Sequence, residues 1–173
     1  RELLAAPDPS TRAGIRDLAM LHLATDAGLR ASELVGLRLD DLTLHPCPSI
    51  RIRGKGRRER VLPLWKESAL ALRAWLAVRG PSPAPELFLN ARGEPMSRWG
   101  FRYVVGKHRA SASAKCPSLA NKRVSPHVLR HTCAMTILGA TGDLRRVSLW
   151  LLFKDTATTE IYTSSGKAAR DFR

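Results

Sequence analysis

Residues 49–64 alternate between apolar and charged side chains, and this pattern restricts the fold more than any other feature. The first run reads SIRIR (49–53), and a second alternating run covers 59–64. Between them lies GKGRR (54–58), whose glycines allow a tight turn. A period of two is typical of strands with one buried face. Two such runs around a glycine-containing turn predict a β-hairpin.

The segments around this hairpin have apolar residues at spacings of three and four, which predicts helices. Before the hairpin, a helix is expected from Ser10 or Thr11 to Asp26 or Ala27, where Gly28 interrupts the helical pattern, and a second one from Ala31 or Ser32. After the hairpin, we expect helices over 68–78, 97–109, 126–140, 143–152 and 156–163. We also expect a short strand over 86–90 and connections over 80–86 and 110–125. This order predicts an α+β domain, mostly helical with a small antiparallel β-sheet.

The chain has 173 residues and a net charge of +14, from 29 Lys and Arg against 15 Asp and Glu. This length fits one domain, and an apolar fraction of 44% is enough for a core. A globular chain this basic usually binds a polyanion, with nucleic acid as the first candidate. A ribosome-associated or merely cationic protein is the alternative.

Other classes of protein are disfavoured by the sequence. No apolar stretch approaches the ~20 residues that cross a bilayer, and the first residues do not form a signal peptide, so we expect no membrane partner. Cys47, Cys116 and Cys133 form neither a CxxC pair nor a Cys/His cluster, which argues against a disulfide framework and a metal site. A reducing cytoplasm fits this usage.

Three polar residues near position 130 fall on one face of a predicted helix. His127, Arg130 and His131 are spaced i, i+3 and i+4. The core-facing residues of this helix are expected to be Val128, Leu129, Met135, Ile137 and Leu138. An arginine beside two imidazoles suits phosphate binding with proton transfer nearby. A solvated polar face is the alternative.

Three further residues are candidates on their own chemistry. Arg30 lies just before a predicted helix N-terminus, which favours anions, and Glu33 can hold its guanidinium; a weak surface ion pair is the alternative. Lys55 lies between two glycines at the hairpin tip, where it can donate a proton or only touch phosphates. Tyr162 has a phenol that can act as a covalent nucleophile or simply pack.

Taken together, these residues have the order and spacing of a known family. The segments GLRASELVGLRLDDL, GKGRRERVLPL, HVLRHT and TTEIYT resemble the catalytic domain of the tyrosine recombinases, the phage-type integrases. The resemblance extends from about Leu18 to Thr163, which is most of the chain.

The resemblance implies a role for each candidate. Arg30 and Arg130 would bind the scissile phosphate, and Tyr162 would attack it to form a 3′-phosphotyrosyl link. Lys55 would protonate the leaving oxygen, and His127 would assist proton transfer. Supporting positions would be Glu33, His131 and the position of Phe153.

The same resemblance implies the partners. The family acts on double-stranded DNA, as a tetramer of protomers, without ATP, metal or other cofactor, so a location at the nucleoid is expected. We expect most of the charge to contact the phosphate backbone, and the helix around 98–109 is a candidate for reading bases. The basic residues assigned to DNA contact are Arg57, Arg58, Arg60, Lys115, Lys122 and Arg123.

Two departures from the family pattern lead to further expectations. Phe153 occupies the position, nine residues before Tyr162, where His or Trp is usual, and Phe donates no hydrogen bond. A slow enzyme, substitution by Lys154, an aromatic wall of the active site, or a decayed copy that only binds DNA would each explain it. About seventeen residues precede the match, so 1–173 is expected to be a catalytic-domain fragment without the family's N-terminal DNA-binding domain. A type IB topoisomerase-like enzyme is the remaining alternative.

Overall fold

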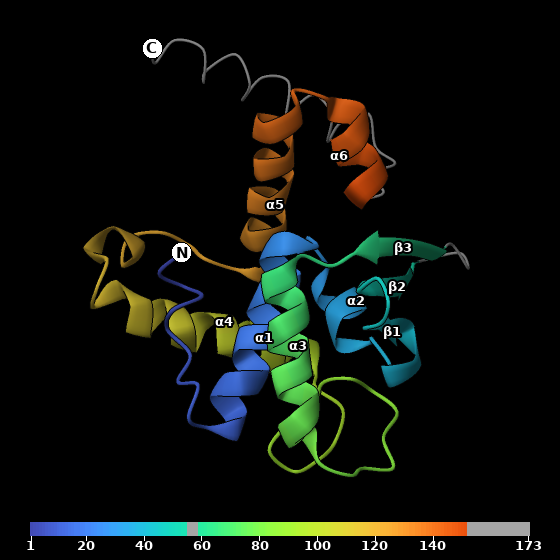
Figure 1. Ribbon diagram of the computed structural model, residues 1–173. Coiled ribbons are helices and arrows are strands. Elements are labelled where there is room, and N and C mark those ends of the chain that lie inside the picture. Colours follow the sequence, from blue (N-terminus) through green and yellow to red (C-terminus); the bar gives the residue numbers. More distant parts are fainter. Residues whose placement is uncertain (55–58, 152–173) are drawn as a thin grey trace.

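The computed structural model describes residues 1–54 and 59–151 (Figure 1). Its helices are α1 (Arg12–Asp26), α2 (Ala31–Val35), α3 (Lys66–Arg79), α4 (Arg98–Ser113), α5 (Pro126–Thr141) and α6 (Leu144–Leu151). Its strands are β1 (Leu42–Thr43), β2 (Ser49–Arg53) and β3 (Glu59–Pro63), and short 3-10 turns cover Leu39–Asp41 and Pro117–Leu119. The predicted fold class, α+β and mostly helical with a small antiparallel sheet, is confirmed.

The hairpin predicted at 49–64 is confirmed, since β2 and β3 pair antiparallel with Ile50 opposite Leu62 and Ile52 opposite Arg60. All four of these residues are buried, because alternate residues of a strand face the same side. The two-residue strand β1 adds a third member in the order β1-β2-β3. Its shortness explains why no periodic pattern in the sequence indicated it.

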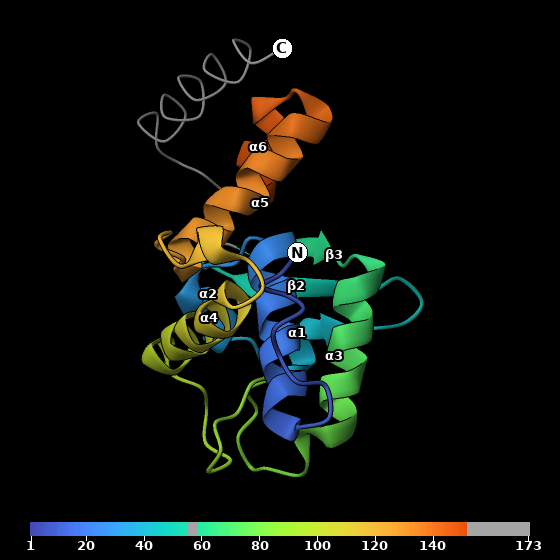
Figure 2. The same ribbon diagram turned by 90° about the vertical axis from the view of Figure 1, so that its left-hand side faces the viewer.

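The main core is built around α1, which lies between α3 and α4 in Figure 2 and also contacts α5. The fully buried residues include Leu21, Leu72 and the aromatic side chains of Trp75, Phe88 and Phe101. A buried side-chain hydrogen bond joins α1 to α4, because His108 Nε2 lies 2.8 Å from Asp17 Oδ2. The core therefore holds the helices that carry the site residues in fixed positions.

Three expectations about local structure are wrong. Residues 86–90 form no strand but only isolated bridges from Glu86 to Arg38 and from Leu89 to Pro95. Side chains hold this segment instead: Trp75 Nε1 donates to the carbonyl of Leu87. Helix α4 runs on to Ser113, so the connection after it is shorter than expected. Val128, expected to face the core, is 38% exposed.

Helices α5 and α6 project from the rest of the described chain (Figure 1, Figure 2). They share a small hydrophobic cluster of their own, made of buried Cys133, Ala134, Val147 and Leu151. Gly142, with φ of +64°, ends α5 in the left-handed conformation that glycine adopts without strain. No helix within the described ranges is both long and apolar enough to span a membrane.

Candidate active site

Arg30 and Glu33 meet at the start of α2. The carboxylate of Glu33 accepts hydrogen bonds from the backbone N–H of Arg30 at 2.8 Å and from Arg30 Nη1 at 3.1 Å. The side chain of Glu33 is 7% exposed and that of Arg30 is 49% exposed. The expected contact is confirmed, and it leaves a large part of the Arg30 guanidinium open to a ligand.

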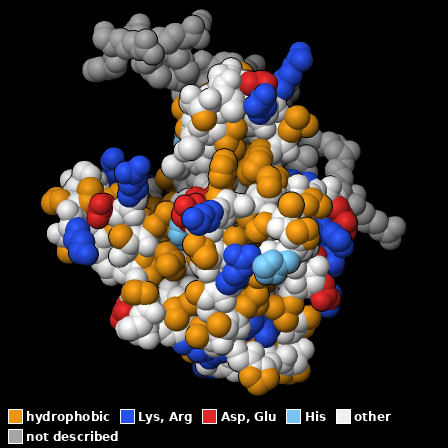
Figure 3. Space-filling model, viewed as in Figure 1, with side chains coloured by type: hydrophobic (Ala, Val, Ile, Leu, Met, Phe, Trp, Pro, Cys, Tyr) orange, Lys and Arg blue, Asp and Glu red, His pale blue; other side chains and the backbone are white. Residues whose placement is uncertain are grey.

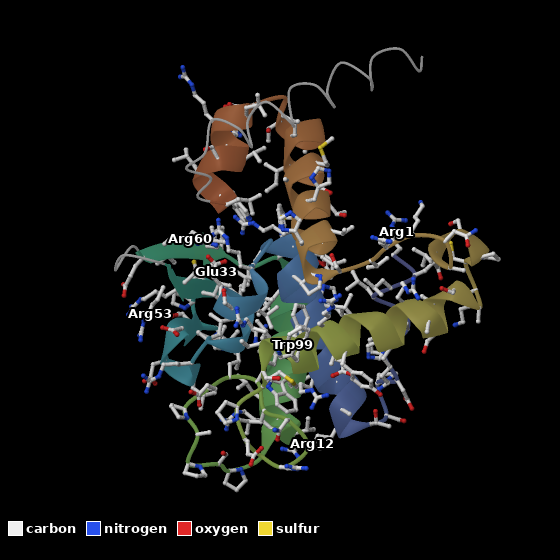
Figure 4. All side chains as sticks on the ribbon, turned by 180° about the vertical axis from the view of Figure 1, so that it is seen from behind. Arg1, Arg12, Glu33, Arg53, Arg60 and Trp99 are labelled. Atoms are coloured by element: carbon white, nitrogen blue, oxygen red, sulfur yellow. The ribbon has the colours of Figure 1, made fainter. Side chains whose placement is uncertain are left out.

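Arg60 reaches the same carboxylate from β3 (Figure 4). Its Nη1 donates to Glu33 Oε1 at 3.2 Å, and its Nη2 donates to Glu33 Oε2 at 3.1 Å. This side chain is 7% exposed. Arg60 was expected on the surface among the DNA-contacting residues, and the structure instead places it inside, as the bidentate partner of Glu33.

Arg130 approaches Glu33 from α5 and is buried. Its Nη1 lies 3.8 Å from Glu33 Oε2, and the residue is 4% exposed. The guanidinium donates to the carbonyl of Gly28 and to the carbonyl of Leu151. A solvated polar face is therefore excluded for Arg130, and the structure brings Arg30, Glu33 and Arg130 together.

Burial and charge shift the pKa values of this cluster. Desolvation lowers the pKa of Arg130 to about 10, and the positive charge of Arg30 acts in the same direction while Glu33 opposes it. For Glu33, burial alone would raise the pKa, but the hydrogen bonds from Arg60 and from the Arg30 backbone outweigh it and hold the pKa below its usual value. At neutral pH the site is thus one carboxylate shared by three guanidinium groups.

Gly28 lies between α1 and α2 and contacts this cluster through its carbonyl oxygen. Its φ is +62°, and an added Cβ would lie 2.5 Å from Leu151 Cδ2 and 2.9 Å from Cys133 Sγ. Only a residue without a side chain fits there, and its carbonyl binds Arg130. The sequence marked Gly28 only as a helix interruption, so this role was missed.

The remaining predicted residues fall into three groups. His127 is exposed in the first turn of α5, and His131 is half-buried one turn later. Exposed basic residues from the connection before α5 are Lys115, Lys122 and Arg123. The residues outside the described ranges are Lys55, Arg57, Arg58, Phe153 and Tyr162.

A separate groove of about 1210 Å³ lies where α5 and α6 meet the rest of the described chain. It is lined mainly by apolar side chains, such as Trp65, Ile137 and Leu149, and hydrophobic surface gathers in this region in Figure 3. Arg30, Glu33 and Arg130 do not line it. The arginine cluster and the groove are therefore distinct features of the surface.

Comparisons with known proteins identify the family of the chain. The model of the phage integrase family matches residues 1–168. An integrase/recombinase of Sinorhizobium fredii, y4rC, is 45% identical over 169 residues, which cover 98% of this chain and 51% of that protein. Tyrosine recombinase XerD of Ralstonia nicotianae is 37% identical over 166 residues, which cover 93% of this chain and 52% of that protein.

A solved structure adds the three-dimensional likeness. The crystal structure of XerH site-specific recombinase bound to palindromic difH substrate, a post-cleavage complex, superposes with a TM-score of 0.83 at 25% identity. The match covers 98% of this chain and 49% of that one. The chain thus spans about half the length of the relatives it matches. With its four motifs, its arginine cluster and these likenesses, the chain belongs to the phage integrase family.

Proposed function

We propose that residues 1–173 form the catalytic domain of a site-specific DNA recombinase that cleaves and rejoins strands through a 3′-phosphotyrosyl intermediate at Tyr162. The observation that carries the proposal is the convergence of Arg30 and Arg130 on Glu33. A carboxylate that gathers guanidinium groups from separate elements builds a site with excess positive charge. Such a site suits a phosphodiester whose negative charge grows in the transition state.

The proposed reaction conserves the energy of the phosphodiester. Tyr162 Oη attacks the phosphorus in line and loses its proton, with His127 as the acceptor. The bond from phosphorus to the 5′ oxygen breaks, and Lys55 donates a proton to that oxygen. Arg30 and Arg130 stabilise the non-bridging oxygens throughout. Attack by a 5′ hydroxyl from another strand reverses these steps and releases the tyrosine, so neither ATP nor a metal ion is required.

Double-stranded DNA is the proposed substrate. The similar XerH recombinase is bound to its palindromic difH substrate in the solved structure, and the net charge of +14 favours a polyanion. On α4, Arg98, Trp99, Arg102 and Tyr103 are exposed, and the Arg102 guanidinium lies 5.7 Å from the Trp99 ring centroid. A helix of this width fits the major groove, so we propose that α4 contacts bases. Recombination would use a tetramer of protomers on DNA, in the cytoplasm at the nucleoid.

The experiment is a trapping assay with a nicked DNA substrate, from which the short leaving strand diffuses away after cleavage. Because the target sequence is unknown, a pool of duplexes from DNA flanking the coding region serves as substrate. We expect a denaturant-resistant protein–DNA adduct that disappears in Tyr162→Phe. An adduct that persists in Tyr162→Phe would contradict the proposal.

Together with measurements of DNA binding and plasmid relaxation, this assay separates the alternatives. Salt-sensitive DNA binding without an adduct, in both the wild type and Phe153→His, would favour a DNA-binding remnant of a recombinase. Relaxation of supercoiled plasmid by a monomer without sequence preference would favour a topoisomerase-like enzyme. Adduct formation that is slow in the wild type and faster in Phe153→His would identify Phe153 as the cause of reduced activity.

A further inference from the structure

Arg60 lies in β3, and its guanidinium contacts the carboxylate of Glu33. Its neighbours Glu59 and Val61 point to the exposed side of the sheet, and Arg60 points inward with Leu62. Two parallel N–H···O bonds, at 3.2 and 3.1 Å, join the planar guanidinium to the planar carboxylate. This bidentate arrangement fixes both the position and the orientation of the carboxylate.

Glu33 needs such a restraint because other cations compete for its oxygens. Arg30 Nη1 donates to Oε1 at 3.1 Å, and Arg130 Nη1 lies 3.8 Å from Oε2. If the carboxylate were free to rotate, it could close further on Arg30 and engage the donors that a phosphate requires. With Arg60 on both oxygens, the carboxylate orients Arg30 while its distance to Arg130 stays longer than a hydrogen bond.

We propose that Arg60 is a positioning residue of the recombinase site, which holds Glu33 so that the half-exposed Arg30 keeps donors available to the scissile phosphate, and that Arg60 itself does not contact DNA. This inference rests on the proposed function. It replaces the expectation that Arg60 belongs with the surface residues that track the phosphate backbone. It also assigns the inward face of β3 a part in the site, although β3 itself supplies no group to the phosphate.

The test compares Arg60→Met and Arg60→Lys with a matched control, Arg51→Met. Arg51 lies in the neighbouring strand and is exposed on the other side of the sheet. Two quantities are measured for each protein: the rate of adduct formation at saturating DNA, and the slope of log Kd against log salt concentration. The unfolding temperature of each variant is recorded, so that a variant that does not fold is recognised.

We expect adduct formation to fall by about 100-fold in Arg60→Met and about 10-fold in Arg60→Lys, as for the loss of residues that orient a functional group. Lysine keeps the charge but cannot make two parallel bonds. The salt slope should stay unchanged in both variants and in Arg51→Met, which should also keep the wild-type rate of adduct formation. Arg123→Met, at an exposed residue assigned to phosphate contact, should reduce the slope by about 0.9.

A double-variant comparison checks that Arg60 acts through Glu33. If it does, Arg60→Lys combined with Glu33→Gln should be no slower than Glu33→Gln alone, because the second change has nothing left to disturb. Additive losses would contradict the proposal. This comparison uses only Arg60→Lys, so it remains decisive if Arg60→Met fails to fold.

Two results would overturn the proposal that Arg60 is a positioning residue. A salt slope reduced by about 0.9 in Arg60→Met would make Arg60 a phosphate contact and overturn the proposal. A full rate in Arg60→Lys would show that charge alone suffices and would overturn it as well. If the wild type forms no adduct that depends on Tyr162, the proposed function fails, whereas the salt slope still tests the placement of Arg60: an unchanged slope supports it and a reduced slope contradicts it.

Discussion

Arg30 and Arg130 reach the same carboxylate but are held in opposite ways. Arg30 is half-exposed and its described contact is to a side chain, that of Glu33. Arg130 is buried and its guanidinium binds main-chain carbonyls at Gly28 and Leu151. One arginine is therefore adjustable when a ligand arrives, whereas the other is part of the packing that joins α5, α6 and the loop after α1.

Because of this difference, we expect substitution of the two arginines to have similar effects on catalysis but different effects on stability. Both arginines should matter for chemistry, because each places donors at the same site. Only Arg130 should matter much for stability, because its removal leaves buried carbonyls unpaired and Glu33 less compensated. Substitutions at the two positions, and at the residues that hold them, test this separation in order of decreasing effect on the free energy of unfolding.

The largest effect is expected for Arg130→Gln. Breaking a buried ionic contact by removing one partner costs about 3 kcal/mol, and adduct formation should fall by at least about 100-fold. Urea unfolding followed by circular dichroism measures the first quantity, and the trapping assay measures the second. A variant with wild-type stability would show that the contacts to Gly28 and Leu151 do not stabilise the fold.

Gly28→Ala should come next, with a loss of about 2 kcal/mol. A positive φ costs a residue with a side chain about 1–2 kcal/mol, and the added Cβ would meet Leu151 and Cys133. The control is Gly139→Ala in α5, where an added Cβ would meet no described atom within 4 Å apart from its chain neighbours and the nearby backbone of its own helix; there a gain of up to about 1 kcal/mol is expected. Equal effects of the two changes, measured by urea unfolding, would contradict this account of Gly28.

Glu33 should give a smaller effect that depends on pH. Its pKa in the folded chain lies below the usual 4.5, so its stabilisation is fully present above that value and is lost as the pH falls through the lowered folded pKa. Relative to Glu33→Gln, the wild type should be more stable by about 1–2 kcal/mol at pH 7, and the difference should narrow below pH ~4.5. Unfolding between pH 3 and 7 checks this, with the exposed Glu59→Gln as a control. A difference that persists unchanged at pH 3 would refute the assignment.

The smallest change in stability is expected for Arg30→Gln. A half-exposed ion pair contributes about 0–1 kcal/mol, so urea unfolding should shift little. Adduct formation should nevertheless fall by about as much as in Arg130→Gln. If Arg30→Gln destabilised the chain as much as Arg130→Gln, the contrast between the two arginines would disappear.

What the sequence predicted correctly was local. The hairpin, the helix ends near residues 26 and 31, and the contact of Arg30 with Glu33 each depend on residues a few positions apart. The alternation of β3 also contained the inward direction of Arg60, since Arg60 and Leu62 are two residues apart. That signal was overlooked because basic residues of a hairpin suggested a surface contact.

The parts that were not predicted depend on distant segments. Arg130 and Gly28 are 102 residues apart, and no local pattern relates an arginine to a particular carbonyl. Residues 86–90 have strand-like composition, but a strand needs a partner, and the structure offers only single bridges there. The roles of Lys55 and Tyr162 remain predictions, since both lie outside the described residues.

The contacts of Arg130 also bear on how this chain tolerates genetic variation. A main-chain carbonyl is present in every residue type, so the hydrogen bond at position 151 survives exchange of Leu151 for other apolar residues of similar volume. At position 28 the same kind of bond comes with a backbone that only glycine accepts readily. A library randomised at both positions should retain several side chains at 151 and almost none but glycine at 28. The residue at position 151 can therefore change over evolution while the residue at position 28 stays glycine, although both bind the same arginine.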